Sequence, residues 1–422
     1  MRFFVELNPS PRAERHSPEM VVSFVPMEAL GEFGGLRLDA EKRLDEVLTG
    51  YTYFAENDVL VAKITPCFEN GKGALAEGLA NRTGFGTTEL YVLRARPGLV
   101  SRFLFYLTIS HPFRKIGESE MYGAGGQKRV PPHVVRDFRF ARPSLAEQRA
   151  IALFLDRETA RIDRLVACKK RLIELLSEKR AALITRAVTR GLDSGVPLKD
   201  SGVNWLGEIP AHWETRRLKE LSALQTGLTL GKTYEGQQLT TRPYLRVANV
   251  QDGYLDLAEI TEIEVPVQDV HHYELQAGDV LMTEGGDFDK LGRGYVWEGQ
   301  IAGCLHQNHI FVVRPQPDRL NSHLLALVMS SHYGRAYFTA ESKQSTNLAS
   351  TNTKTLRNFP IPLPPLSEQE AIVGWVKLQT AKIDQLTGRI REGIDRLHEY
   401  RTALIWAAVT GKIDVHEEVE VI

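Results

Sequence analysis

The chain has 422 residues, 43% of them apolar and 25% charged, and a formal net charge of −1 from 52 Lys and Arg against 53 Asp and Glu. This length exceeds one compact core and predicts two or three domains, and the composition is unlike that of disordered or polybasic proteins. No apolar run approaches the ~20 residues that span a bilayer, and the first 30 residues lack a signal-peptide core, so we expect a cytoplasmic protein without a membrane partner.

Cysteine usage excludes two further classes. Cys67, Cys168 and Cys304 stand apart, without C-x-x-C spacing. We therefore expect neither a disulfide framework nor a zinc site.

Residues 1–142 form a first variable segment, in which short strands are expected to alternate with glycine-rich turns. The β-rich runs include Val21–Val25, Val59–Ala62 and Leu90–Leu93, and Ser101–Ser110 has a helical pattern. A mixed α+β domain is therefore expected here.

A long amphipathic helix is expected over residues 143–193. Ser144 and Glu147 fit a capping box at its start, and Gly191 stands where the helix should stop. Apolar residues recur at alternating steps of four and three, which predicts a coiled-coil seam. The seam residues are Ile151, Leu155, Ile162, Leu165, Leu172, Leu176 and Leu183.

Residues 194–204 read as a glycine-containing linker, and a second variable segment follows at 205–363. Its pattern is of the same kind as that of the first. The β-rich runs are Tyr244–Val247, Val280–Met282 and Ile310–Val313, and the helical stretch is Ser322–Ser331. We expect a second α+β domain built like the first.

Residues 364–414 repeat the first helical segment. At an offset of 221, about 22 of 51 positions are identical without a gap, which marks a tandem duplication. Ser367 and Glu370 are expected to cap this helix and Gly411 to end it, before an acidic tail at 415–422. The seam residues are Ile372, Val376, Ile383, Leu386, Ile390, Leu397, Tyr400 and Leu404.

The two matching seams favour an intramolecular antiparallel coiled coil that relates the two halves by pseudo-two-fold symmetry. A period of 3.5 residues keeps an apolar stripe on one side only when a partner helix wraps it. The alternative is that each segment is an ordinary amphipathic helix of a bundle core.

Signatures of catalysis are missing from the sequence. Gly227–Thr233 is one residue short of a phosphate-binding loop, and neither G-x-G-x-x-G opening a helix nor G-x-S-x-G occurs. His306-x-x-His309 and the His271–His272 pair lack further ligands at metal-site spacing, so we interpret them as polar loop histidines. Neither a catalytic residue nor a metal ligand is therefore assigned.

Polar loops recur at corresponding places in the two variable segments. Gln and Asn suit bidentate contacts with adenine, Arg and Lys suit guanine, and hydroxyls and glycine amides suit phosphates. The repetition favours a DNA-binding surface, whereas a solvated surface is the alternative for any single loop. The candidates are Lys63, Thr87, Thr88, Gln127, Lys128 and Arg129 in the first segment, and Arg246, Asn249, Lys290, Arg293, Gln307, Asn308, Lys343, Gln344, Ser345 and Asn347 in the second.

Several motifs carry a resemblance to a known family. They are P-P-L-S-E-Q-E at Pro364–Glu370, R-P-S-L-A-E-Q-R at Arg142–Arg149, I-D-x-L at Ile162–Leu165 and Ile383–Leu386, W-L-G-E-I-P-A-H-W at Trp205–Trp213, and G-D-V-L at Gly278–Leu281. With them the chain resembles the specificity (S) subunits of type I restriction–modification systems.

The resemblance implies that each variable segment is a target recognition domain that reads one half of a bipartite site on double-stranded DNA. It implies that the paired helices act as a ruler on which two methyltransferase (M) subunits and the restriction (R) subunits dock. S-adenosylmethionine, ATP and Mg would be used on those partners, with no cofactor and no catalysis on this chain.

Two rival functions and one departure from the family pattern remain. The rivals are a stand-alone methyltransferase or nuclease, which the missing motifs oppose, and a coiled-coil scaffold without its own DNA specificity. The W-x-G-E-I-P lead-in of the second variable segment would fall before Met1 in the first. The first domain therefore either starts upstream or begins naturally with Arg2–Ser10.

Overall fold

The computed structural model describes residues 1–10, 17–229, 231, 234–286, 294–341, 343–344 and 349–415. The chain divides into unit 1, Met1–Lys170 with Arg391–Ile422, and unit 2, Arg171–Ile390. Helices and sheets are mixed in both units, which confirms the predicted α+β class.

Unit 1 contains two four-stranded sheets. The first is antiparallel throughout, in the order β1 (Val5–Leu7), β8 (Leu90–Ala95), β5 (Val59–Ala62) and β6 (Gly73–Leu75). The second has the order β3 (Glu41–Arg43), β2 (Val21–Val25), β7 (Thr83–Gly86) and β4 (Thr52–Ala55), with β2 and β7 parallel. Its helices before the long one are α1 (Leu44–Val47), α2 (Ser101–Ile109), α3 (His111–Ser119) and α4 (Pro132–Asp137).

Unit 2 repeats this arrangement. Its antiparallel sheet has the order β12 (Ser222–Thr226), β19 (Ile310–Pro315), β15 (Val280–Thr283) and β17 (Gly294–Val296). A second sheet has the order β14 (Thr261–Pro266), β13 (Leu239–Leu245) and β18 (Leu305–His306), and β13 and β18 are parallel like β2 and β7. The helices are α6 (Val267–Tyr273), α7 (Ser322–Ser330), α8 (His332–Ala340) and α9 (Thr353–Arg357).

Small sheets complete unit 2. The order of one is β16 (Gly285–Gly286), β21 (Ala349–Ser350) and β20 (Lys343–Gln344), and β11 (Glu214–Arg217) pairs with β22 (Pro360–Leu363). The expected linker enters a hairpin of β9 (Leu198–Asp200) and β10 (Glu208–Pro210). The predicted strand at Tyr244–Val247 is wrong at its end, because Val247–Asn249 forms a 3-10 helix.

The same buried ion pair ties the central strands in each unit. Asp58 accepts hydrogen bonds from Arg94 at 2.7 and 2.8 Å, and Asp279 accepts them from Arg314 at 2.7 Å each. Each aspartate side chain is 1% exposed. This repeat of position and contact shows that the duplication reaches beyond the helices into the β-rich domains.

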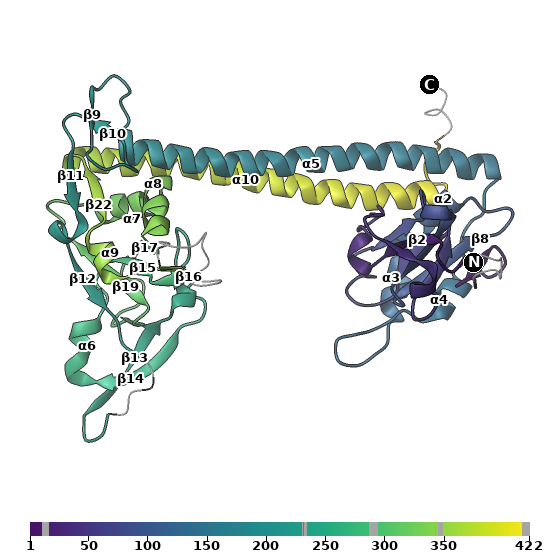
Figure 1. The fold of residues 1–422 in the computed structure, drawn as a ribbon, viewed down its shortest axis with the longest axis horizontal. Coiled ribbons are helices and arrows are strands. Elements are labelled where there is room, and N and C mark those ends of the chain that lie inside the picture. The colour runs from purple at the N-terminus through teal and green to yellow at the C-terminus, as the bar shows by residue number, and fades with distance from the viewer. Residues whose placement is uncertain are drawn as a thin grey trace. The chain divides into compact units, whose positions relative to one another are not determined.

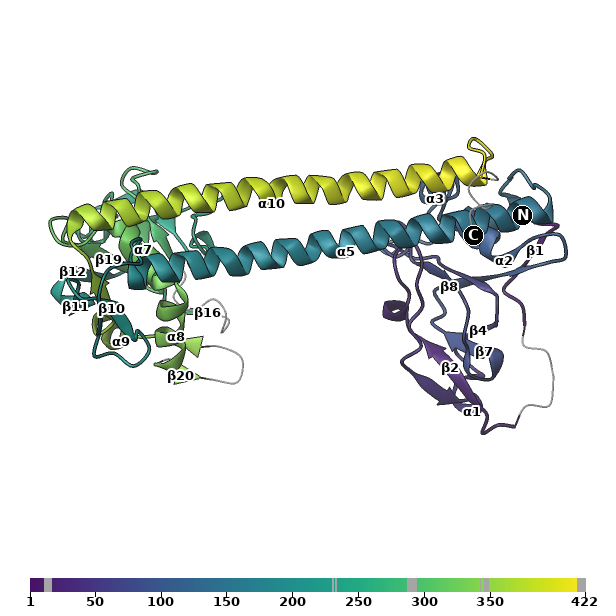
Figure 2. The same cartoon turned by 90° about the horizontal axis from the view of Figure 1, so that it is seen from above.

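The long helices α5 (Leu145–Arg190) and α10 (Leu366–Val409) are antiparallel in both units, and the two views agree that they run side by side (Figures 1 and 2). In unit 1, Arg401 Nη1 lies 2.6 Å from Asp163 Oδ1, and Arg401 also donates to Phe33 O at 3.1 Å. In unit 2, Arg180 pairs with Asp384.

The seam prediction is correct in part. Ile151, Leu155, Ile162, Leu176, Ile372, Val376, Ile383, Ile390 and Leu404 are buried, and Leu183 and Leu397 are half-buried. It is wrong for Leu165, Leu172, Leu386 and Tyr400, which are 43–55% exposed. In α5 the buried stripe takes a step of four from Leu155 to Thr159 and then passes through Val166, because a straight helix has 3.6 rather than 3.5 residues per turn.

The helix ends also divide into confirmed and wrong predictions. Ser144 Oγ accepts from Glu147 N at 3.2 Å, and Gly191 and Gly411 have φ of +73° and +68° just beyond the two helices. The predicted cap at Ser367 is wrong, because α10 begins at Leu366, after Pro365. In the aligned sequences Pro365 stands where Ser144 does.

Among the described residues, no helix has the length and apolarity needed to cross a membrane. In the same part of the chain, no group of three or more His, Cys, Asp or Glu side chains is placed to hold a metal ion. All three cysteines are free thiols.

Candidate nucleic-acid interface

Several predicted DNA-binding residues of unit 1 meet at the adjacent ends of β5 and β8. Lys63, the residue after β5, donates its backbone N–H to Glu89 O at 3.0 Å, and its carbonyl accepts from Val130 N at 2.8 Å. Thr87 and Thr88 lead into β8 directly before Glu89. We call Lys63, Thr87, Thr88, Glu89 and Arg129 site 1.

The glycine-rich loop at 123–129 is anchored beside these strand ends. Thr65 Oγ1 accepts from Lys128 N and donates to Gly126 O, both at 2.9 Å. Gly125 and Gly126 have φ of +65° and +76°, a conformation that glycine adopts without strain. The anchoring leaves Gln127 and Lys128 exposed at the surface.

Arg129 is not a free cation. Its guanidinium donates to both oxygens of Glu89, at 2.8 and 2.9 Å. This hydrogen-bonded pair holds the pKa of the Glu89 carboxyl below its ordinary value. Since Arg129 already has a bidentate acceptor, Lys63 and Lys128 are better placed than Arg129 to donate to DNA.

Unit 2 repeats this backbone arrangement with other side chains. Glu284, the residue after β15, donates its N–H to His309 O at 2.9 Å, and its carbonyl accepts from Thr351 N at 2.9 Å. The pairing of Gly285, Ser350 and Lys343 repeats that of Ile64, Arg129 and Tyr122 at an offset of 221. We call Glu284, Gln307, Asn308, His309 and Ser350 site 2.

The side chains of site 2 are joined by a different contact. His309 Nδ1 lies 2.6 Å from Glu284 Oε2, with the two side chains 56% and 34% exposed. Gln307 Oε1 accepts from Val247 N at 3.1 Å, which occupies one of its polar atoms. Site 2 therefore has the carboxylate of Glu284 and the imidazole of His309 where site 1 has the ammonium group of Lys63 and the carboxylate of Glu89.

The prediction that Asn249 binds DNA is wrong, because its side chain is 4% exposed and makes hydrogen bonds inside the domain. Its Oδ1 accepts from Arg246 N at 2.8 Å, and its Nδ2 donates to Asp256 O and Glu259 O at 2.9 Å each. Arg246 is half-buried and precedes the 3-10 helix that Asn249 closes. Both residues shape the loop.

His306 also departs from prediction. It is fully buried rather than a polar loop residue, and its Nδ1 lies 3.2 Å from Ile310 O. Burial lowers the pKa of the His306 imidazole to about 4.

Some predicted residues cannot be assigned a contact. Lys290, Arg293, Ser345 and Asn347 lie outside the described residues. Lys343 and Gln344 are placed only as strand β20.

Glu89 and Glu284 belong to these candidate sites but are not among the predicted residues, because the predicted residues are donors to bases and phosphates and a carboxylate is an acceptor. His309 was interpreted only as a polar loop histidine. One signal was available in the sequence. When the two halves of the sequence are aligned at the offset of 221, Lys63 corresponds to Glu284. The charge is reversed at this position, although Asp-Val-Leu precedes it in both halves.

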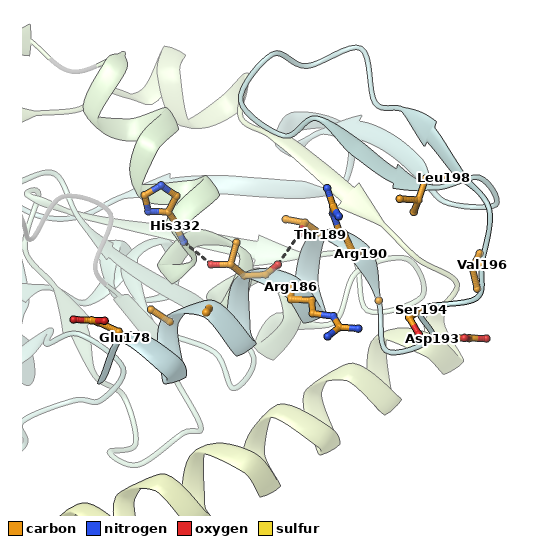
Figure 3. A pocket seen from close by; sticks show the side chains of 13 residues that line it. Glu178, Arg186, Thr189, Arg190, Asp193, Ser194, Val196, Leu198 and His332 are labelled. Carbon is orange, nitrogen blue, oxygen red and sulfur yellow. Dashed lines mark hydrogen bonds between the residues drawn. The ribbon is translucent and has the colours of Figure 1, made fainter. Parts of the chain in front are cut away.

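A groove of about 850 Å³ lies on α5 in unit 2, between the helix and the stretch before β9 (Figure 3). Thr185 Oγ1 accepts from His332 N at 3.0 Å within it. Its lining combines apolar side chains, such as Ala181, Ala182 and Val196, with charged side chains of both signs, such as Arg186 and Glu178. A groove with this mixed lining is better suited to binding a protein than to binding a nucleic acid.

The comparisons with known proteins all find proteins of type I restriction–modification systems. Residues 210–396 match the family model described as "Type I restriction modification DNA specificity domain". The chain is 40% identical over 146 residues to the type I restriction enzyme EcoAI specificity subunit of Escherichia coli, covering 34% of this chain and 25% of that one. It is 24% identical to the EcoKI specificity subunit of E. coli K12, covering 76% and 68%. The chain thus spans about a quarter of the length of the first of these relatives.

Solved structures share the fold. A chain from a structure of the complex assembly and conformational transition of the type I R-M system superimposes with a TM-score of 0.71 at 19% identity, covering 94% of this chain and 93% of that one. The HsdS subunit from Thermoanaerobacter tengcongensis gives 0.53 at 19% identity, covering 94% and 92%. The expected pair of α+β domains on two long helices is confirmed.

Proposed function

We propose, from the similarity of the chain to the specificity subunits of type I restriction enzymes, that it reads a bipartite sequence on double-stranded DNA. Unit 1 reads one half-site and unit 2 reads the other. The catalytic residues of methylation and cleavage reside on partner subunits that dock on this chain.

One observation carries the proposal. Sites 1 and 2 have the same backbone hydrogen bonds, from Lys63 to Glu89 and Val130 and from Glu284 to His309 and Thr351, but opposite charges on the side chains. A constant frame with exchanged polar side chains is what two readers of different base sequences need, because base edges are distinguished by donors and acceptors.

Exposed apolar side chains on the long helices support the docking of partner proteins. In unit 2, Leu172, Leu378 and Leu386 are 43–55% exposed on α5 and α10, and the groove around Thr185 lies on the same helix as Leu172. Apolar side chains exposed to this extent can be buried by a protein partner. We assign the partners as two methyltransferase subunits and the restriction subunits.

The remaining expectations belong to the same proposal. The partner subunits bind and use S-adenosylmethionine, ATP and Mg. This chain is non-catalytic, and the assembly works in the cytoplasm, where the host DNA is.

A domain exchange tests the proposal. Residues 205–363 are replaced by the corresponding segment of a related subunit, and methylated sites are mapped across the host genome. We expect one bipartite motif to depend on the gene, with only one half changed by the exchange. A change in both halves contradicts independent reading by the units.

The alternative of a scaffold without DNA specificity gives a different result. In that case the exchange leaves the methylated motif unchanged while the assembly still forms. Footprinting with and without the partner subunits provides a second comparison of the same two functions.

A further inference from the structure

The two halves of the chain can be compared position by position, because each unit holds one copy of the same frame. Positions with the same residue in both copies include buried contacts such as Asp58–Arg94 and Asp279–Arg314. Lys63 and Glu284 also correspond, since each follows the equivalent strand and makes the equivalent two backbone hydrogen bonds. Their side chains, however, differ in charge and reach solvent.

The hydrogen-bonding capacities of these two side chains are opposite. An ammonium group only donates, and an ionised carboxylate only accepts. In the major groove guanine presents the acceptors O6 and N7, whereas cytosine and adenine present exocyclic amino donors at N4 and N6. One frame can therefore select different bases through this single position.

The neighbours leave each group available for such a contact. In site 1, Arg129 binds both oxygens of Glu89, so that carboxylate already has a bidentate partner. Lys63 Nζ lies over the ring of Tyr91, 5.3 Å from its centroid, a contact that uses none of its hydrogen-bond donors in a conventional hydrogen bond. In site 2, His309 lies against Glu284 Oε2, and among the described residues no donor is hydrogen-bonded to Oε1.

We infer that Lys63 and Glu284 are equivalent specificity-determining residues. Lys63 donates to a guanine in the half-site of unit 1, and Glu284 accepts from the amino group of a cytosine or adenine in the half-site of unit 2. The inference rests on the proposed function and adds the bases that each unit selects.

The test maps methylated motifs in cells that carry the full-length chain with its partner subunits. Glu284→Met removes the acceptor at nearly constant size, and Glu284→Lys installs the chemistry of site 1. Glu298→Met is the matched control, because Glu298 is also an exposed carboxylate beside a histidine, 3.3 Å from His323, at the opposite end of the β15–β17 pair.

With Glu284→Met, we expect the preference at one amino-bearing base of a single half-site to fall at least about tenfold. Glu284→Lys should shift that position toward guanine, and Glu298→Met should retain the wild-type motif. Lys63→Met should relax one guanine in the other half-site.

Each outcome decides a different point. If both Glu284 variants methylate the wild-type motif unchanged, the inference is overturned while the proposed function stands. If the wild-type gene determines no methylated motif, the proposed function fails instead. Thermal melting of the purified variants checks folding, and Glu284→Lys is the deciding variant if Glu284→Met is unstable.

Discussion

Gln148 and Gln369 make the same three hydrogen bonds at the starts of the two long helices. Gln148 Nε2 donates to Gly98 O and Pro143 O, and its Oε1 accepts from Val100 N at 2.8 Å. Gln369 Nε2 donates to Arg319 O and Pro364 O, and its Oε1 accepts from Asn321 N at 2.8 Å. Each buried amide thus joins its helix to the domain before it by main-chain contacts alone.

Gln148→Leu is expected to lower the free energy of unfolding by about 2–4 kcal/mol, because two carbonyls and one N–H lose their buried partner. Urea denaturation followed by circular dichroism measures the change. Gln276→Leu is the control, since Gln276 is exposed. Equal stability of the two variants would contradict a structural role for Gln148.

The stability of the protein is expected to depend on pH through His306. Its pKa is about 4 in the folded protein, below the ordinary value of about 6.5, so between these values the unfolded chain binds a proton that the folded chain does not. The free energy of unfolding should therefore fall by up to roughly 3 kcal/mol as the pH falls through this window. The contribution of His306 to the free energy of unfolding should level off below about pH 4.

Urea denaturation across this window measures the effect, with His306→Gln as the comparison. The variant should lose this part of the slope and keep the part that other groups contribute. Parallel curves for the two proteins would show that His306 does not titrate with unfolding.

Lys128→Ala is expected to weaken DNA binding and to reduce the slope of log affinity against log salt by about 0.9, the value for one phosphate contact. Binding of the assembled complex at several salt concentrations measures it. Lys115→Ala is the control, because Lys115 is paired with Glu118 on α3. If the slope of log affinity against log salt is the same for Lys128→Ala as for Lys115→Ala, Lys128 does not contact a phosphate.

Thr185→Trp is expected to fill the groove on α5. The equivalent position in unit 1 is Trp406, whose ring lies 6.4 Å from that of His111, so the frame accommodates this side chain. Native mass spectrometry should then find one protein partner fewer in the assembly. Thr185→Ser, which keeps the acceptor for His332 N, should retain every partner, and unchanged stoichiometry with Trp would exclude the groove as a docking surface.

Matched insertions of seven residues, after Arg171 in α5 and after Ile390 in α10, are expected to lengthen the unread spacer of the DNA motif. Seven residues add about 10 Å of helix, which corresponds to about 3 base pairs. Both half-sites should stay the same because neither domain is altered. An unchanged spacer in an intact assembly would refute the hypothesis that the length of the paired helices sets the spacing of the half-sites.

Much of the architecture could be predicted because local patterns determine it. Strand runs such as Val59–Ala62 and Ile310–Val313 and the stops at Gly191 and Gly411 depend on burial period and on backbone freedom within a few residues. The seam was harder to place, because the buried stripe passes through Thr159 and Val166 and so leaves Leu165 and Leu172 exposed, while Ile162 and Leu176 stay in it.

The candidate site was predicted as a place but not as a set of contacts. The bridges of Arg129 and Ser350 at the ends of the two loops correspond, yet the pairing of Arg129 with Glu89 joins residues 40 positions apart. Asn249 has the composition of a base reader, and only its two carbonyl acceptors reveal that it closes a loop. Such contacts depend on chain segments that meet only after folding.

The buried guanidinium of Arg401 limits how the long helices can align in unit 1. Its side chain is held by Asp163 and by Phe33 O, from a helix and from the β-rich domain. Sliding α10 by one turn would carry the guanidinium about 5.4 Å away from both acceptors. Arg401 therefore selects one register of α10 against α5 in unit 1, the register in which both acceptors are within hydrogen-bond distance.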